Sequence, residues 1–438
     1  MTELKRHLTL SHLVFYGVGD IVGAGIYALI GKLAAEAGGL AWLSFVVAGL
    51  AVLPTALTYA ELTGRYPRSG GVAVFAGRAF DDPRVPFVVG FLVLLTGLVS
   101  AATSANGFHG YLSTFVALPR WCVAVSFIGF LCWINHRGID TSSRFNILCV
   151  VAEVGGLLAI LIFGLPHWLE GSFLSGRGES LLSPETLQGI ASASLLAFFA
   201  SIGFEDICNV SEEVKEPERV VPRAILLCVT ITSLIYIGIA LTVVSVASVE
   251  ELGSSSAPLA LVAERIMPFF SSKVVALLAL FSVSNTALAN LIMGSRLLYG
   301  MSREGWIFRR AASLHATRQT PTVAIVATFL ITLGIALSGT VKVLGQTTST
   351  IMLTLFVIVN LSLLVIRIRK LPPDSERFHF RVPILVPCLG VLFALSLLTQ
   401  APEGAFGRSG LLLMIGFVFY LIYRATEKRK KGPAPASP

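Results

Sequence analysis

The chain has 438 residues, of which 55% are hydrophobic and only 13% are charged, and its mean hydropathy is +0.80. A soluble domain of this length does not tolerate such a composition, so we expect a lipid bilayer to be its solvent. The formal net charge is +8, but we exclude nucleic-acid binding because the basic residues are distributed as in the loops of membrane proteins.

The apolar residues form blocks of about 20 residues, which is the length with which a helix crosses ~30 Å of hydrocarbon. Within the blocks, apolar and polar residues do not alternate, and this excludes a membrane β-barrel. We therefore predict an all-α integral membrane protein with about twelve transmembrane helices. In chain order, the predicted spans are 10–30, 42–62, 87–108, 121–134, 145–165, 187–208, 225–246, 274–299, 321–338, 344–365, 382–398 and 411–423.

Lys and Arg residues are distributed unequally between the two sides that these spans define. If the N-terminus is cytoplasmic, 25 of the 33 basic residues lie in inner segments and 7 in outer segments, while Arg296 lies inside a span. The positive-inside rule therefore predicts a multi-pass protein of the cell inner membrane with both termini in the cytoplasm. A missed helix would exchange the sides of all later loops, so the asymmetry also supports an even number of spans.

The first span, with the sequence GVGDIVGAGIYALIG, contains five glycines and the carboxylate of Asp20. Glycines at this depth indicate either close packing against another helix or an unwound backbone around a cavity. A carboxylate in mid-membrane costs about 2.5 to 3.5 kcal/mol, so Asp20 requires a cavity, a partner or a proton. We therefore favour an interruption of this helix around Gly23 and Gly25.

The sixth span shows a similar interruption. In SASLLAFFASIGFEDICNVSEEV, Ser201 and Gly203 precede the acidic pair Glu205 and Asp206 in an apolar context. Two interrupted helices thus stand five spans apart, at corresponding positions of two halves of the chain. This arrangement is typical of transporters built from an inverted repeat.

Four sequence motifs resemble those of the amino acid, polyamine and organocation (APC) superfamily of permeases. The first is Gly-Ala-Gly-Ile at 23–26, in the first span, and the second is YAELTGRYPRSGG at 59–71. The third is EEVKEPERVVPRAI at 212–225, and the fourth is SRLLYGMSREG at 295–305. They occur in the family's order and cover most of the chain up to Gly305, whereas the last two spans carry no recognised motif.

The resemblance implies a LeuT-like fold, in which five helices are followed by an inverted repeat of five and by two extra C-terminal helices. On this basis the whole chain, 1–438, is one transmembrane domain. The first repeat covers approximately 10–166, the second 187–367 and the extra helices 380–424, and 425–438 is a cytoplasmic tail. The family's substrate site lies between the unwound parts of the first and sixth spans.

The substrate site that this resemblance implies agrees with the chemistry of broken helices. Backbone N–H groups freed at 23–25 suit a substrate carboxylate, because unpaired donors and partial positive charge converge there. Freed carbonyls at the two breaks suit an ammonium group, and Phe199 falls where the family's gating aromatic lies. The expected substrate-binding residues are Asp20, Ile21, Gly23, Ala24, Gly25, Phe199, Ala200, Ser201 and Gly203.

Two carboxylates are candidates for proton coupling, Asp20 and Glu153. Glu153 of the fifth span falls where some proton-coupled relatives place a buried lysine, and a carboxylate that loses its water can take up a proton. Alternatively, Glu153 only pairs with another buried polar group. Sodium coupling would instead use oxygen atoms of the eighth span, although such side chains usually bond to the backbone. The sodium candidates are Ser284, Asn285 and Thr286.

The acidic residues near the end of the sixth span leave two interpretations open. Glu205 and Asp206 either face an inner vestibule or cap the end of the helix. The glutamates that follow are expected to form a solvated cluster with nearby basic residues, because charges of both signs alternate there. The members of this expected cluster are Glu212, Glu213, Lys215, Glu216, Arg219 and Arg223.

These observations predict a secondary active transporter that moves an amino acid or related amine by alternating access, with proton coupling. The alternatives are a sodium-coupled symporter, an exchanger of the same fold, or a transporter-like channel or sensor. We do not expect an enzyme, because no nucleophile or metal motif accompanies the buried acids. We expect no cofactor and no metal, since the six cysteines lack metal-ligand spacing.

Overall fold

The structure is a computed structural model, and it describes most of the chain. The described residues are 6–82, 84–113, 115–168, 183–255, 258–267, 272–338, 341–374, 377–378, 380–399, Gly407, Gly410 and Met414. They form helices joined by short connections, with an isolated bridge between Leu8 and Val214. Except for Met414, the last predicted span and the predicted tail lie outside the described residues.

Seven helices of the described part are long and apolar enough to cross a membrane, which confirms the all-helical membrane class. The apolar stretches lie in α1 (Leu10–Ala37), α2 (Ala41–Arg65), α4 (Arg84–Leu112), α6 (Ile139–Trp168), α8 (Pro217–Val246), α11 (Ser272–Arg303) and α13 (Val341–Ile368). Shorter helices are α5 (Arg120–Arg137), α7 (Pro184–Ala200), α12 (Thr322–Ser338) and α14 (Leu385–Leu398). Each of the first eleven predicted spans falls on one of these helices, in the same order. The total of twelve stays a prediction.

The remaining elements are short helices that connect these long ones. They are α3 (Gly71–Ala79), α9 (Val249–Ser254), α10 (Pro258–Ile266) and the 3-10 segments η1 (Gly38–Leu40), η3 (Phe204–Glu213) and η4 (Arg309–Ala312).

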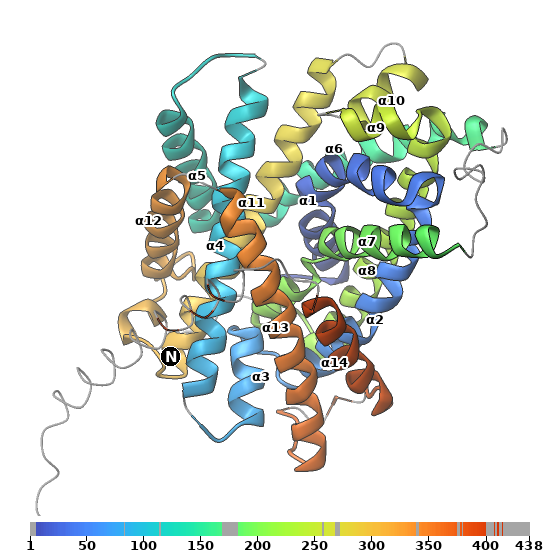
Figure 1. Cartoon of the computed structure of the whole chain (residues 1–438). Coiled ribbons are helices and arrows are strands. Elements are labelled where there is room, and N and C mark those ends of the chain that lie inside the picture. The colour runs from blue at the N-terminus through green and yellow to red at the C-terminus, as the bar shows by residue number, and fades with distance from the viewer. Residues whose placement is uncertain are drawn as a thin grey trace, which may run out of the picture.

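Helix α1 lies in the middle of the bundle (Figure 1) and contacts α6, α7, α8 and α11. Helices α4, α5 and α12 form one flank of the molecule, and α2, α7 and α8 form the other. Helix α11 packs against α4 and against α1, so it joins the two flanks. The first predicted span is therefore surrounded by other helices, which explains how it can hold a carboxylate and several glycines.

The structure confirms both predicted interruptions. Inside α1, Gly23 leaves the helical conformation with φ 18° and ψ −170°. Helix α7 ends at Ala200, and after a non-helical turn the chain continues as η3 from Phe204. Gly203 in this turn has φ 133°, a conformation that favours glycine because a side chain would clash with the backbone. Since α1 packs against both α7 and η3, the two breaks lie close together.

Candidate functional site

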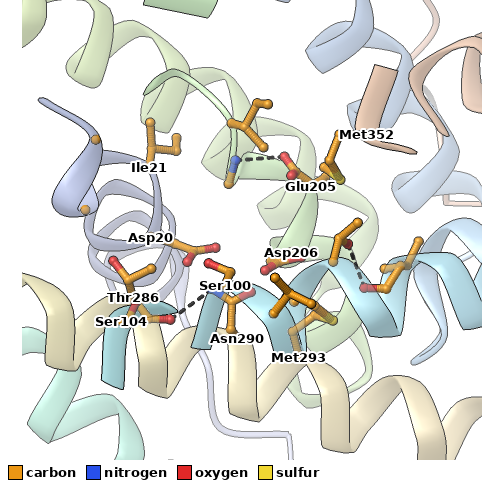
Figure 2. Close-up of a pocket in the computed structure, with 18 of the residues that line it drawn as sticks. Asp20, Ile21, Ser100, Ser104, Glu205, Asp206, Thr286, Asn290, Met293 and Met352 are labelled. Atoms are coloured by element: carbon orange, nitrogen blue, oxygen red, sulfur yellow. Dashed lines mark hydrogen bonds between the residues drawn. The ribbon is translucent and has the colours of Figure 1, made fainter. Parts of the chain in front are cut away.

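A cavity of about 380 Å³ lies where the two broken helices meet (Figure 2). Helices α1, α4 and α11 line it together with η3 and the turn before η3. Its volume is within the range of cavities that enclose small molecules. Six of the residues predicted to bind substrate line it: Asp20, Ile21, Gly23, Gly25, Ala200 and Gly203.

The other three residues predicted to bind substrate are placed differently. Ser201 is buried but does not line the cavity, and its hydroxyl donates to the carbonyl of Ala197 at 2.8 Å. The side chains of Ala24 and Phe199 lie outside the described part of the structure. The gating role expected of Phe199 therefore stays a prediction.

Close packing around the breaks explains why glycine occupies two of these positions. A Cβ atom at Gly23 would lie 2.7 Å from Thr286 Oγ1 of α11, and one at Gly203 would lie 3.0 Å from the backbone of Asp20. At Gly25, by contrast, a Cβ atom would make an ordinary contact of 3.5 Å with Ala200. The backbones at Gly23 and Gly203 thus approach their neighbours in a way that no side chain permits.

The hydroxyl of Tyr236 connects the two breaks, and the sequence analysis did not identify it. It lies 2.8 Å from the carbonyl oxygen of Ile21 and 3.1 Å from that of Ala200, so it can donate to either. A buried tyrosine hydroxyl requires a hydrogen-bond partner, but the position of Tyr236 in the sequence does not identify this partner. The carbonyls expected to receive a substrate ammonium therefore already accept from the protein, and each keeps a second lone pair.

Three carboxylates line the cavity, and all are buried. Asp20 is 6% exposed, Glu205 5% and Asp206 6%. The side chains of Asp20 and Asp206 face each other in Figure 2. Glu205 Oε2 accepts from the backbone N–H of Gly203 at 2.9 Å. Glu205 thus lines the cavity, and its bond to Gly203 lies at the start of η3 and not at the end of the predicted sixth span.

The rest of the lining divides into a polar and an apolar part. Ser100 and Ser104 of α4 and Asn290 of α11 lie near the pair formed by Asp20 and Asp206 (Figure 2). Asn209 of η3 is 1% exposed, and neither of its amide atoms has a hydrogen-bond partner in the described chain. The apolar part includes Val72, Val93, Val99, Met293, Met352 and Leu355.

Glu153 of α6 is fully buried but does not line the cavity. Its Oε1 atom accepts from the hydroxyl of Ser282 at 2.6 Å, whereas Oε2 has no hydrogen-bond partner among the described residues. The alternative that Glu153 only pairs with another buried polar group thus accounts for one of its two oxygen atoms.

The three sodium candidates do not share one site. The hydroxyl of Ser284 donates to the carbonyl of Leu280 at 2.6 Å, and Asn285 Oδ1 accepts from Asn146 at 2.5 Å. Thr286 lines the cavity, and its hydroxyl has no hydrogen-bond partner within the described ranges. Over the same ranges, no three His, Cys, Asp or Glu residues are grouped closely enough to hold a metal ion.

A second group of acids, of which Glu61 and Glu213 are buried, lies where α2, α11 and α13 end, and we call it the ion-pair end. Glu61 is fully buried and accepts from Arg65 Nε at 2.9 Å, from Arg367 and from the backbone N–H of Val382. Asp374 accepts from Arg68 at 2.7 Å. The acids of the ion-pair end are Glu61, Glu212, Glu213 and Asp374, and their partners are Arg65, Arg68, Arg78, Arg296, Arg303 and Arg367.

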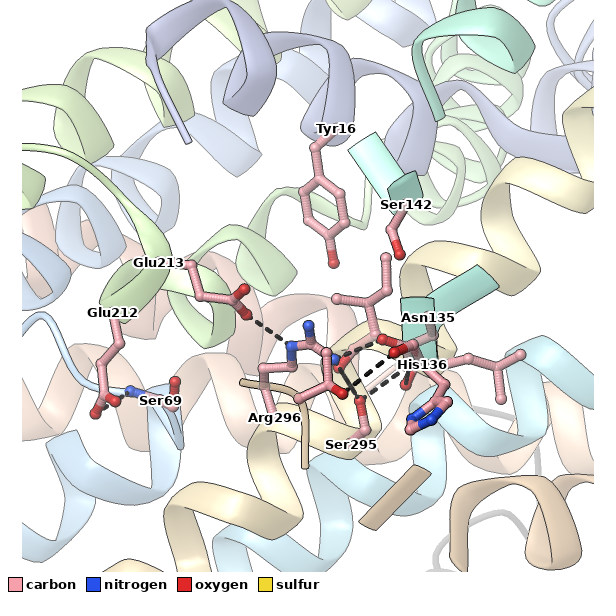
Figure 3. Close-up of polar contacts among 12 residues, drawn as sticks. Tyr16, Ser69, Asn135, His136, Ser142, Glu212, Glu213, Ser295 and Arg296 are labelled. Carbon is pink, nitrogen blue, oxygen red and sulfur yellow. Dashed lines mark hydrogen bonds and ion pairs between the residues drawn. The ribbon is translucent and has the colours of Figure 1, made fainter. Parts of the chain in front are cut away.

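The expected solvated cluster after the sixth span is wrong for Glu212 and Glu213. Glu213 is 2% exposed and binds Arg296 Nε at 2.7 Å (Figure 3), and Glu212 binds Arg303 at 2.8 Å. The reason is that η3 carries both glutamates against α11, away from the basic residues that follow in sequence. Arg296 also donates to Asn135 Oδ1 at 2.5 Å, so its charge is enclosed by protein groups.

The sequence is similar to those of known amino acid permeases and other transporters. The family model described as amino acid permease matches residues 8–422. The chain is 26% identical to the branched-chain amino acid permease BcaP of Bacillus subtilis, over 96% of this chain and 93% of that protein. It is 24% identical to the methylthioribose transporter of the same organism, over 96% and 94%. It is 28% identical to cationic amino acid transporter 4 of Mus musculus, over 86% of this chain and 62% of that protein.

Proposed function

We propose that this chain, which belongs to the amino acid permease family, is a secondary active transporter. It moves an amino acid or a related amine by alternating access. The chain is a multi-pass membrane protein of a family of transporters. The observation that carries the proposal is that both broken helices open onto one cavity.

In the proposed binding mode, the cavity holds the two charged groups shared by all amino acids. The carboxylate binds the backbone N–H groups of 23–25, where the break frees donors and the helix end supplies partial positive charge. The ammonium binds near Asp20, Ile21, Phe199 and Ala200. Tyr236 donates its hydroxyl hydrogen to the carbonyl of Ile21 or to that of Ala200, so the carboxylate of Asp20 is the strongest remaining acceptor.

We also propose the five-plus-five repeat, with halves at 10–166 and 187–367 followed by extra helices within 380–424. Support comes from the positions of the breaks, because each interrupts the first helix of its half. In such transporters one half or bundle moves against the other around a fixed site. The contact of α1 with α7 and η3 supports this division, because the cavity then lies at the junction of the proposed halves.

For the topology, we propose a cell inner membrane location with both termini in the cytoplasm. The unequal distribution of Lys and Arg supports this orientation. The ion-pair end would then face the cytoplasm, since it contains segments that the sequence analysis assigned to the inner side.

We propose proton coupling through Glu153 and Asp20. Glu153 keeps one buried oxygen without a partner in the described chain, and the carboxyl groups of Asp20 and Asp206 face each other in the cavity (Figure 2). Two carboxyl groups can bond to each other only when one of them carries a proton, because an ionised carboxylate has no donor. Sodium coupling is the alternative, for which Thr286 is the best-placed oxygen.

Counterflow in proteoliposomes tests the proposed function. Vesicles are loaded with an excess of one unlabelled amino acid or amine at a time, and entry of a trace of the same labelled compound is followed. A carrier produces a transient accumulation of label above equilibrium, because it exchanges outgoing for incoming substrate. Absence of this overshoot for all amino acids and amines, with label only equilibrating, would contradict the carrier and favour a channel or a sensor.

A further inference from the structure

The cavity contains three acidic side chains and, among the described residues that line it, no basic one. Asp20, Glu205 and Asp206 contribute the carboxylates. At the ion-pair end, the buried acids Glu61 and Glu213 have Arg partners within hydrogen-bond distance, whereas Glu153 of α6 bonds to the hydroxyl of Ser282. Leaving buried carboxylates charged and without a cation is unfavourable, so each of them either carries a proton or is neutralised by a cation that enters the cavity.

Unpartnered polar atoms in the cavity wall support this conclusion independently of the charges. Asp20 Oδ2 has no hydrogen-bond partner in the described structure, although the side chain is only 6% exposed. Both amide atoms of Asn209 are in the same situation at 1% exposure. Buried polar groups are nearly always hydrogen-bonded, so these atoms require a polar partner from outside the described chain, which the polar groups of a substrate supply when they displace water.

The apolar part of the lining limits the form of this ligand. Met293, Met352 and Leu355 belong to the same cavity as the three acids. Methionine and leucine side chains offer contacts to methylene groups and none to a compact hydrated ion. A chain of methylenes with a positive charge at each end matches both parts of the wall.

We infer that the substrate carries two positive charges joined by a methylene chain, as a basic amino acid or a diamine does. This inference rests on the proposed function, because it names the substrate class of the same cavity. One ammonium lies at the break of α1 between Asp20 and Asp206, and the other lies beside Glu205 and Asn209. A neutral amino acid supplies no charge to the second position, so it binds more weakly.

Three related probes test the inference on the purified full-length protein. L-lysine has both positive charges, L-norleucine lacks only the side-chain ammonium, and cadaverine lacks only the carboxylate. Binding is measured by calorimetry or by thermal shift. We expect L-lysine or cadaverine to bind roughly 10- to 100-fold more tightly than L-norleucine, which is the range for a hydrogen-bonded charge.

The order of the two cationic probes identifies the source of the charges. Tighter binding of L-lysine indicates a basic amino acid, because its carboxylate then uses the N–H groups of 23–25. Tighter binding of cadaverine indicates a diamine. Both results support the inference.

Substitutions of cavity residues test whether the preference for L-lysine and cadaverine over L-norleucine arises in the cavity. In Glu205→Gln, the advantage over L-norleucine is expected to shrink by about tenfold, because a charge-assisted contact to the side-chain ammonium is lost. Glu212→Gln is the matched control, since it removes a carboxylate of the same η3 that does not line the cavity. It should keep the wild-type ratio. If a cavity variant fails to fold, the relative affinities of the three probes for the wild-type protein still test the inference.

Equal or tighter binding of L-norleucine to the wild type would overturn the inference. In that case the proposed function survives, because an amino acid still binds, and protons rather than a second ammonium neutralise the carboxylates. Failure of all three probes and of all other amino acids to bind or exchange would instead overturn the proposed function, and the inference with it.

Discussion

The cavity and the ion-pair end both bury carboxylates, but they differ in the groups that face them. At the ion-pair end, each acid lies against one or more arginines, and Glu213 and Arg296 are both almost fully buried. In the cavity, Asp20, Glu205 and Asp206 have no basic partner among the described lining residues. The same side-chain chemistry is therefore structural in one region and available to a ligand in the other.

The difference follows from the cost of burying charge. A buried ion pair holds its geometry because loss of either partner leaves an uncompensated charge in a low-dielectric environment. A buried acid without a partner binds a proton or a cation readily, and it releases either one when water enters. Transport requires such exchange, so the unpaired acids are the ones that we expect to change their partners during the transport cycle.

The largest expected effect is at the ion-pair end. Glu213→Gln leaves the charge of Arg296 buried and unpaired, so we expect a loss of about 3 to 5 kcal/mol in the free energy of unfolding. Unfolding in denaturing detergent measures it. Glu216→Gln is the control, because Glu216 is exposed and follows the same η3.

A second variant sharpens this test of the ion pair. The double variant Glu213→Gln, Arg296→Met removes both charges, so it should recover part of the lost stability. A stability of Glu213→Gln equal to that of the wild type would show that the pair is not structural.

The next prediction concerns the substitution of a cavity acid by its neutral amide. Asp20→Asn removes a buried charge that has no basic partner, so we expect stability equal to or greater than that of the wild type. Substrate affinity should fall roughly 10- to 100-fold, because a charge-assisted contact is lost. Stability and binding are measured on the same preparation. Strong destabilisation with unchanged affinity would remove the distinction between the two regions.

The steric difference between two glycines gives the third prediction. Gly23→Ala places a Cβ atom 2.7 Å from Thr286 Oγ1, whereas Gly25→Ala makes only a 3.5 Å contact. We expect Gly23→Ala to weaken substrate binding by about tenfold, a cost typical of overpacking. Gly25→Ala should have the smaller effect. Adding Thr286→Ala to Gly23→Ala should restore binding in part. If both alanines act equally, packing at Gly23 is not what positions the site.

The smallest expected effect is that of Tyr236→Phe. Removing this hydroxyl leaves the carbonyls of Ile21 and Ala200 without its hydrogen bond, at a cost of about 0.5 to 1.5 kcal/mol in stability. Thermal unfolding of the purified protein measures the change. Tyr16→Phe is a comparison, since its hydroxyl bonds to Ala289 at 3.2 Å, away from both breaks. Only Tyr236→Phe should also alter substrate affinity.

The sequence predicted the breaks because their causes are local. Glycines and a carboxylate in the apolar first span, and Ser201 to Gly203 before two acids, indicate interrupted helices without knowledge of their neighbours. The partners of Glu213 and of Tyr236 depend on which helices pack together, and no sequence spacing encodes that contact. The nearest basic residues were therefore chosen for Glu213, whereas the actual partner, Arg296, is 83 positions away.

Proton-driven accumulation most directly tests the claim that unpaired buried acids exchange their charge during transport. Proteoliposomes are given an inward pH gradient or an inward sodium gradient, and uptake of labelled substrate is compared between the wild type, Glu153→Gln and the control Glu212→Gln. We predict that the pH gradient drives accumulation by the wild type and the control, while Glu153→Gln exchanges substrate without concentrating it. Accumulation driven by sodium alone, or undiminished in Glu153→Gln, would contradict the account.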